Sequence, residues 1–282
     1  MEVSSLWFNT QFTIVRAPHV LRLKSLEGKI LKPNIQVDFE NEFYQVKTIN
    51  HPEELAQVLS LRFEVFFREF STQKVTFSLF PYDVDMHDFI CDHLIVKDKV
   101  EDKVVACYRL LSSNTDKKIK RFYSEGEFDI SSLLAAPGNK LELGRACVHK
   151  DYRNGAVISL LWKGLLDYAK QADTRYMFGC SSINRKDFQN VPQIMEYLEK
   201  QGSFINDFNI GVQPKYKMKF KVNGSAEAPN GGKAMGSLMH MYIMAGAKMG
   251  RTLAYDAEMD CLDMFTLMDM KNLPPSFKRR FA

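Results

Sequence analysis

The sequence has few of the features that mark secreted, membrane-spanning or disulfide-stabilised proteins. Its five cysteines are an odd number and form no C-x-x-C pair, so neither a disulfide framework nor a cysteine-rich zinc site is indicated. No apolar run reaches the roughly 18 residues of a spanning helix, and the chain does not start with the basic and apolar segments of a signal peptide. We therefore expect a cytoplasmic protein that does not span a membrane.

The charge balance is nearly even. The 282 residues include 38 Lys and Arg and 34 Asp and Glu, which gives a net charge of +4 and argues against a dedicated nucleic-acid binder. A hydrophobic share of 45% and a charged share of 26% are typical of a globular protein. Residues 1–43 show no sustained period and are interpreted as an N-terminal extension to one domain over 44–282. The linker-like stretch 223–234 separates elements that are too small to be domains.

The hydrophobic pattern predicts alternating strands and helices. A strand over 43–49 precedes a helix that opens at Pro52 and runs to about Phe70, since proline and acids suit a first helical turn. HLIVKDK and VVACYRLL flank the charged turn VEDK and predict an antiparallel hairpin. A strand (KLELGRACVH), a turn, a helix (AVISLLWKGLLDYAKQA) and a strand (RYMFGCSS) follow. This order is typical of an α+β fold with a mixed sheet.

The C-terminal third continues the pattern. VPQIMEYLEKQ predicts a helix, KYKMKFKV a strand of strict alternation, GSLMHMYIMAGAKMG a helix ended by Gly250, and DMFTLMDM a last strand. The proposed strand places four lysines on one face: Lys215, Lys217, Lys219 and Lys221. They form either a solvated face or a basic ridge for an acidic partner or anionic lipid, together with the basic residues 278–280.

One arginine and one cluster of acidic residues stand out in the first half of the chain. Arg62 lies on the apolar stripe of the first helix, so it is either a surface residue on a frayed stripe or a buried guanidinium facing a carboxylate or a polar pocket. The segment FPYDVDMHDFICDH gathers Asp83, Asp85, Asp88 and Asp92 with two histidines. It is a solvated acidic loop, a metal site or a wall for a cationic substrate; it lacks the glycine and distal glutamate of a calcium loop, and we expect no bound metal.

The strand KLELGRACVH carries Glu142 and Arg145 on either side of Gly144. Glycine inside a strand often marks a bulge, which would bring both charges to one opening. There a carboxylate could act as general base on an incoming ammonium group, directly or through water. The alternative is a structural ion pair that braces the sheet.

The turn after this strand is a candidate anion site. In DYRNGAVI the free amides of the next helix converge near Gly155, and Arg153 adds a fork of donors that fits a phosphate. One arginine and one glycine before a helix do not by themselves separate an anion site from an ordinary turn. No G-x-S-x-G or cysteine-centred motif supports covalent catalysis, and one S-x-x-K match (STQK, 71–74) does not by itself indicate it.

Taken together, these segments resemble the ornithine-acyl carrier protein N-acyltransferases, which make lyso-ornithine lipid. The resemblance covers about residues 44–281 and rests on LRFEVFFREF, DHLIV, VVACYRLL, LELGRACVHKDYRNGAVISLLWKGLLDYA, MFGCSS and the methionine-rich closing segment. These proteins, some of which are labelled haemolysin-like, are bacterial members of the GNAT superfamily. They are similar to the acyl-homoserine lactone synthases.

The resemblance implies an acyl-CoA N-acyltransferase fold: a central mixed, twisted sheet with splayed strands, flanked by helices. It implies a lipid-biosynthetic transferase with no permanently bound cofactor. The donor would be a long-chain, 3-hydroxylated acyl thioester on the phosphopantetheine of acyl carrier protein, with acyl-CoA as an alternative, and the acceptor the α-amine of ornithine. Contact with the inner face of an anionic membrane fits this function, whereas nucleic acid does not.

Site residues follow from the same resemblance. Glu142 and Arg145 match catalytic positions, and the substrate-binding positions are Arg62, Asp83, Asp85 and Arg109. The donor-binding positions are Ala146, Cys147, Val148, Arg153, Asn154, Gly155, Ala156 and Val157. The chain departs from the usual Q/R-x-x-G-x-G/A motif at Ala156 and Ile158, which disfavours acetyl-coenzyme A. Other N-acyl amino acid synthases, a lactone-forming synthase, an acetyl-CoA-dependent acetyltransferase and a non-enzymatic lipid-binding protein stay open as alternatives.

Overall fold

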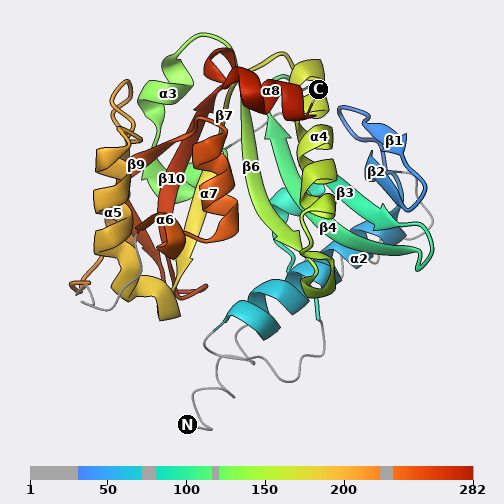
Figure 1. Cartoon of the computed structure of the whole chain (residues 1–282), viewed down its shortest axis with the longest axis horizontal. Helices are drawn as coiled ribbons and strands as arrows, with labels where there is room; N and C mark the ends of the chain where they lie inside the picture. The colour runs from blue at the N-terminus through green and yellow to red at the C-terminus, as the bar shows by residue number, and fades with distance from the viewer. Residues whose placement is uncertain (1–30, 72–80, 116–120, 223–230, 282) are drawn as a thin grey trace, which may run out of the picture. The chain divides into compact units, whose positions relative to one another are not determined.

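The computed structural model describes residues 31–71, 81–115, 121–222 and 231–281, which fall into two compact units (Figure 1). Unit 1 contains the described residues up to Leu111 together with Thr115 and Leu143–Ala172. Unit 2 contains Ser112–Asn114, the described residues up to Glu142, and the chain from Asp173 onward. Each unit has its own core and is treated separately below.

Unit 1 is built on an antiparallel sheet. Its strands pair in the order β1 (Asp38–Glu40), β2 (Tyr44–Thr48), β3 (Asp92–Asp98) and β4 (Lys103–Ser112). The second half of β6 (Asn139–Val148) also belongs to this unit, where Val105 O accepts a hydrogen bond from His149 N at 2.8 Å. The strand predicted over 43–49 and the predicted hairpin around VEDK are both confirmed.

Residues 31–43, the described part of the predicted N-terminal extension, are tied to this sheet. The Asp92 carboxylate accepts hydrogen bonds from Asn34 N at 3.0 Å and Ile35 N at 3.1 Å. Val37 is buried and its amide donates to Thr48 Oγ1 at 3.0 Å. Residues 1–30 of the extension lie outside the described residues.

The predicted helix from Pro52 to about Phe70 has the expected extent but two geometries. α2 (Pro52–Phe63) begins with proline and two glutamates in its first turn, and η1 (Glu64–Phe70) continues it as a π-helix. Leu55, Val58 and Leu59 are at most 2% exposed and form the unit's core with residues of β3 and β4. The apolar stripe of the sequence is therefore the buried face of the helix.

A second α-helix in the described part of unit 1, α4 (Ala156–Gln171), matches the predicted helix and lies against β2 and β3 (Figure 1). The approach is close at Gly164, where a Cβ atom would come within 2.7 Å of Val46 Cγ1. Any larger residue there would force the Val46 side chain to shift. The short 3-10 helices η2 (Met86–Phe89) and η4 (Lys150–Tyr152) complete the described part of this unit.

Unit 2 supplies the parallel component of the sheet. The first half of β6 pairs in parallel with β7 (Thr174–Asn184), and β7 pairs antiparallel with β10 (Cys261–Asp269), which pairs with β9 (Lys248–Asp256). The pairing of β6 with β7 ends at Glu142 and Phe178, although β7 continues for six more residues. Phe178 and Phe265 rings pack at 5.7 Å in the core of this unit. The mixed sheet with flanking helices is confirmed.

The remaining elements of unit 2 surround these strands. β5 (Phe128–Asp129) and β8 (Gly211–Val212) form a small separate sheet. The α-helices are α3 (Ser131–Ala135), α5 (Val191–Lys200), α6 (Gly231–Ala234), α7 (Ser237–Met244) and α8 (Pro275–Phe281). The 3-10 helices are η3 (Tyr123–Gly126), η5 (Arg185–Asn190), η6 (Pro214–Tyr216) and η7 (Met270–Asn272). No helix among the described residues has both the length and the apolar character that crossing a membrane requires.

Two predictions for this unit are wrong. KYKMKFKV is not a strand: Pro214 opens the 3-10 turn η6, and only Lys217 makes an isolated bridge, to Ala254. The four lysines are exposed, so the alternation reflects a loop that packs Phe220 between Phe188 and Tyr255. The helix predicted to end at Gly250 ends at Met244, because Gly246 takes a left-handed conformation (φ 83°). The apolar residues after it begin β9.

Candidate active site

Unit 1 holds a buried network of three arginines and three aspartates. Arg62 donates to Asp83 Oδ2 through Nε at 2.8 Å and to Asp88 Oδ1 through Nη1 at 2.6 Å. Arg109 Nη1 donates to both Asp85 oxygens at 2.8 Å and to Asp88 Oδ1 at 3.1 Å. The expectation that a buried Arg62 faces a carboxylate is confirmed.

The short helix η2 positions the acidic side of this network. Asp85 caps it by accepting from His87 N at 2.8 Å, and Asp88 Oδ2 accepts from Asp85 N at 2.8 Å. Burial alone would raise the pKa of Asp85, but Arg109, the His87 hydrogen bond and Arg145 hold that pKa well below its usual range. The pKa of Asp88 is lowered against the same effect of burial, chiefly by Arg62. Both aspartates are therefore carboxylates at neutral pH.

Arg145 joins the network through an unusual backbone conformation. Its φ is +50°, a left-handed value that costs a non-glycine residue of order 1–3 kcal/mol. Its Nε lies 3.1 Å from Asp83 Oδ2 and its Nη2 lies 3.6 Å from Asp85 Oδ2. The sequence predicts a strand irregularity near Gly144, and the irregularity falls on the next residue.

Exposure divides the network into an inner and an outer part. The side chains of Arg62, Asp83 and Asp88 have no exposed surface, and that of Arg109 is 4% exposed. Asp85 is 27% exposed and Arg145 15%. Of the six, Asp85 and Arg145 therefore have the most surface that a ligand can reach.

Asp88 is the member that sequence reasoning did not select as a binding residue, although it pairs with both Arg62 and Arg109. Its place three residues after Asp85, where a carboxylate can close a capping box, is the signal that could have found it.

In unit 2, Glu142 is 5% exposed and hydrogen-bonded to backbone. Its Oε1 accepts from Ser124 N at 2.7 Å and its Oε2 from Tyr123 N at 2.8 Å, at the start of η3. Both oxygens thus have fixed positions. Glu142 is also the last residue of β6 that pairs with β7.

The predicted donor turn lies in unit 1. Cys147 Sγ is 3.5 Å from Cys107 Sγ, and this contact, followed by burial, raises the pKa of Cys147 well above its usual value. Arg153 donates through Nε to Val148 O at 3.0 Å and through both terminal nitrogens to the Glu69 carboxylate at 2.5 and 2.8 Å. The guanidinium is thus held in place by a neighbouring carboxylate, and it is only about one third exposed.

The helix that follows begins as the sequence predicts. Gly155 is the residue before α4 and has a left-handed φ of 87°. Asn154 Oδ1 accepts from Ala156 N at 3.1 Å, while Val157 is buried. The side chains of Asn154 and Ala156 are on the exposed side of the turn.

Unit 2 also contains three buried acidic residues that the sequence analysis did not identify as a group. Glu127, Asp256 and Asp263 are 1%, 7% and 3% exposed. Burial, with the Asp263 and Asp256 charges, raises the pKa of Glu127 to about 9, and burial raises the pKa of Asp263 to about 6. The acid Asp263 within the largely apolar run CLDMFTLM was the available signal.

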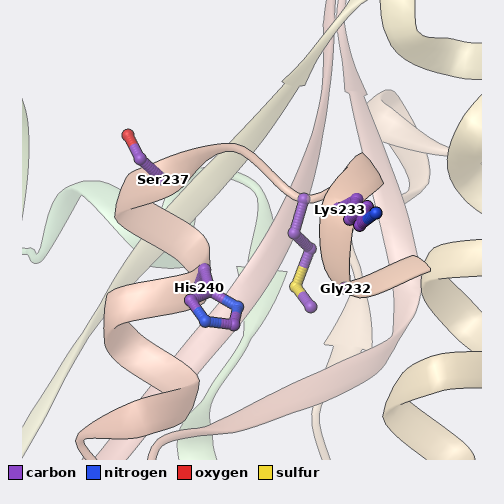
Figure 2. Close-up of a pocket in the computed structure, with 5 residues that line it drawn as sticks. Gly232, Lys233, Ser237 and His240 are labelled. Atoms are coloured by element: carbon purple, nitrogen blue, oxygen red, sulfur yellow. The ribbon is translucent and has the colours of Figure 1, made fainter. Parts of the chain in front are cut away.

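An open pocket of about 700 Å³ lies between α6 and α7. It is lined by Gly232, Lys233, Met235, Ser237 and His240. Figure 2 shows the His240 ring on the side of α7 that faces α6, with Ser237 turned away. The pocket contains none of the sequence-predicted site residues.

Comparisons with known proteins agree on an acyltransferase. Residues 61–163 match the family model of the acetyltransferase (GNAT) domain. The L-ornithine N(alpha)-acyltransferase of Rhodobacter capsulatus is 28% identical over 80% of this chain and 90% of its own length. The enzyme of the same name from Brucella abortus is 29% identical over 81% of this chain and 85% of its own.

Among solved structures, the CoA-dependent acyl-homoserine lactone synthase BjaI matches 81% of this chain and 80% of its own, with 12% identity and a TM-score of 0.44.

Proposed function

We propose that this chain, an N-acyltransferase with a GNAT domain and a relative of the L-ornithine N(alpha)-acyltransferases, makes lyso-ornithine lipid. It would transfer a long-chain 3-hydroxyacyl group from acyl carrier protein to the α-amine of ornithine. The observation that carries this proposal is the pair of relatives of that name, each of which matches at least four fifths of the chain.

The reaction is a direct transfer in this proposal. The neutral α-amine attacks the thioester carbonyl, the C–N bond forms, and collapse of the tetrahedral intermediate breaks the C–S bond and releases the phosphopantetheine thiol. The amine loses one proton to a base, and the leaving sulfur takes up one. Glu142 acts as this base, directly or through a water, with its carboxylate oriented by the amides of Tyr123 and Ser124. No acyl-enzyme is needed.

The charged network of unit 1 binds the acceptor in this proposal. Its reachable members, Asp85 and Arg145, offer one charge of each sign, which suits the ammonium and the carboxylate of an amino acid. Arg62, Asp83 and Arg109 hold these two side chains in place through the internal ion pairs. Substrate binding by this network is therefore shared between contact residues and positioning residues.

The donor binds the strand and turn that follow. Backbone amides of Ala146–Val148 hold the oxyanion, and the turn Arg153–Val157 holds the phosphate of the phosphopantetheine arm. The exposed lysines of residues 215–221 receive the acidic carrier protein, with an affinity that falls as salt rises. The enzyme works in the cytoplasm, with peripheral contact to the inner membrane face, where its product belongs.

The test is product analysis with purified protein and matched donors. 3-Hydroxyacyl groups on acyl carrier protein or on coenzyme A would be offered with ornithine, lysine, glycine or glutamine, and the products identified by mass spectrometry. We expect N-acyl-ornithine from the carrier-protein donor, with fragmentation that places the acyl group on the α-nitrogen. A chain that acylates only from acetyl-CoA, or that forms a homoserine lactone from S-adenosylmethionine, would overturn the proposal.

A further inference from the structure

We infer that Glu127, Asp256 and Asp263 form a cation site in unit 2 that binds the side-chain ammonium of the amino-acid acceptor. The inference rests on the proposed function and names the residues that select ornithine over acceptors with neutral side chains. None of the three belongs to the charged network of unit 1.

The three acids come from separate elements and converge. Glu127 directly follows η3, Asp256 ends β9, and Asp263 lies in β10. One side-chain atom each of Asp256, Cys261 and Asp263 lies within 4.8 Å of the other two. Acceptors around an ammonium lie about 4.6 Å apart when each N···O distance is about 2.8 Å and the directions are tetrahedral. Asp256 and Asp263 are therefore close enough to contact one ammonium together, with the Cys261 thiol beside them.

The surroundings of the Glu127 side chain indicate that it binds a ligand. Within the described residues, neither of its oxygens receives a hydrogen bond from a backbone amide, a hydroxyl or a basic side chain, although it is only 1% exposed. The groups beside it are the carboxyls of Asp263 and Asp256 and the thiol of Cys180. Because facing carboxylates repel, this arrangement needs either a shared proton or a cation.

The other two acids are held in place by their own partners. Asp256 Oδ1 accepts from the amides of Glu258 at 2.8 Å and Met259 at 3.2 Å, and Asp263 Oδ1 accepts from Ser182 Oγ at 2.5 Å. These donors carry no charge. No lysine or arginine forms an ion pair with any of the three acids in the described part of the chain. The cluster is thus rigid and lacks a positive charge from the protein.

The cluster lies close to the proposed base. Ser124 N donates to Glu142 Oε1 at 2.7 Å, and Ser124 Oγ accepts from Cys180 Sγ at 3.6 Å. Cys180 also forms a side-chain hydrogen bond with Glu127, so its thiol lies between the cluster and the backbone that holds Glu142. The inference places the reacting amine of the acceptor at Glu142 and its second ammonium at Glu127.

Tyr216 belongs to the turn beside Glu127. Its side chain is half-buried, and its pKa is raised by burial and then by the charges of Glu127 and Asp256. It belongs to η6, and Gln213, the residue before η6, donates a hydrogen bond from its backbone N to Glu127 O at 2.8 Å. The Lys215 ammonium lies over this ring, 5.1 Å from its centroid.

The test compares ornithine with norvaline, which has the same carbon skeleton without the side-chain ammonium. We would measure kcat/KM for both acceptors in the wild type, Glu127→Gln and Asp263→Asn. Glu196→Gln is the matched control, because this glutamate of α5 is exposed and pairs with Lys200. We expect each cluster variant to lose about 10²-fold for ornithine and to stay within about twofold for norvaline, with the control unchanged for both.

The outcomes separate this inference from the proposed function. If the wild type acylates neither ornithine nor norvaline, the proposed function is wrong, and binding of the two amino acids decides the inference. Equal losses on both acceptors, or no loss on ornithine, would overturn the cation site. A stoichiometric divalent metal in the purified protein that Asp263→Asn removes would also overturn it.

A measurement on the unaltered protein covers the case in which a variant does not fold. An ammonium that binds Glu127 displaces the proton that this residue holds at neutral pH. Calorimetry in buffers of different ionisation enthalpy should show that ornithine releases up to about one proton more than norvaline does. Equal proton release by the two amino acids would overturn the inference.

Discussion

Arg62 Nη1 lies 2.6 Å from Asp88 Oδ1, and neither side chain has any exposed surface. The pair lies at the centre of the network. Asp88 also accepts a hydrogen bond from Arg109, and Arg62 also forms an ion pair with Asp83. Three arginines and three aspartates balance in charge, so burial leaves no net charge uncompensated. Such a network is weak evidence for extra stability, whereas removing one of its members leaves a buried charge uncompensated. It holds Asp85 and Arg145, the two most exposed members of the network, through its internal ion pairs.

Asp88→Ala should destabilise the fold by about 3–5 kcal/mol, because it leaves Arg62 and Arg109 buried with one carboxylate fewer. Urea denaturation followed by circular dichroism measures the change. Glu196→Gln, which removes an exposed pair with Lys200, should leave the midpoint unchanged. A loss below about 1 kcal/mol in Asp88→Ala would mean that the arginines are not confined as described.

Glu142→Gln should lower kcat/KM by about 10²- to 10⁴-fold, since the amide keeps the shape of the side chain but cannot take a proton. The matched control is Glu125→Gln. The Glu125 carboxylate also accepts a hydrogen bond at the start of η3, from Phe122 N at 2.6 Å. Glu125 has no role in the proposed reaction. Steady-state kinetics with the same donor and acceptor, together with unchanged melting temperatures, checks the difference. Equal effects of the two substitutions would assign Glu142 a structural role only.

Most of the fold follows from local patterns. The stripe of α2, the hairpin of β3 and β4, and the β6 to β7 unit all have periods or turns that one segment contains by itself. The errors come from the region where tertiary packing decides. KYKMKFKV alternates like a strand, but Pro214 and the ring contacts of Phe220 make it a loop. β9 was missed because a helical apolar run continued past Gly246.

The candidate site shows the same division. Arg62 was recognisable because a charge interrupts an apolar stripe, and Asp83 and Asp85 because acids crowd one loop. The cluster of Glu127, Asp256 and Asp263 was not, because Glu127 is more than a hundred positions from the other two, which the pairing of β9 with β10 brings together. The hydrogen bonds of Glu142 to Tyr123 and Ser124 likewise join segments with no shared pattern.

The stability of the fold should decrease as the pH rises above about 4.5. The pKa of Glu127 is raised from its ordinary 4.5 to about 9 by burial and by Asp263 and Asp256. Between these values the folded chain holds a proton that the unfolded chain has released, so unfolding becomes easier by up to about 1.4 kcal/mol per pH unit. The stability that protonated Glu127 contributes is fully present below about pH 4.5 and is lost as the pH rises to about 9. Asp263 adds a smaller decrease up to about pH 6.

Glu127→Gln should flatten this dependence, since glutamine does not titrate. Urea unfolding at several pH values between 5 and 9 measures the slope for the wild type, the variant and Glu196→Gln, which should keep the wild-type slope. An unchanged slope in Glu127→Gln would show that this carboxyl is already ionised in the folded protein.

Gly155→Ala should destabilise unit 1 by about 1 kcal/mol through the backbone alone. The φ of Gly155 is +87°, a conformation that costs a residue with a Cβ atom about 1–2 kcal/mol, and no atom lies within 4 Å of the added Cβ. Gly126→Ala is the matched control, because its Cβ also meets nothing within 4 Å but its φ is not positive. The control should be neutral or slightly stabilising, since alanine restricts the unfolded chain.

Because the turn before α4 depends on the left-handed conformation of Gly155, Gly155→Ala should also raise the KM for the acyl donor, while Gly126→Ala leaves it unchanged. Denaturation midpoints and donor kinetics that do not distinguish the two variants would contradict the role of Gly155 in this turn.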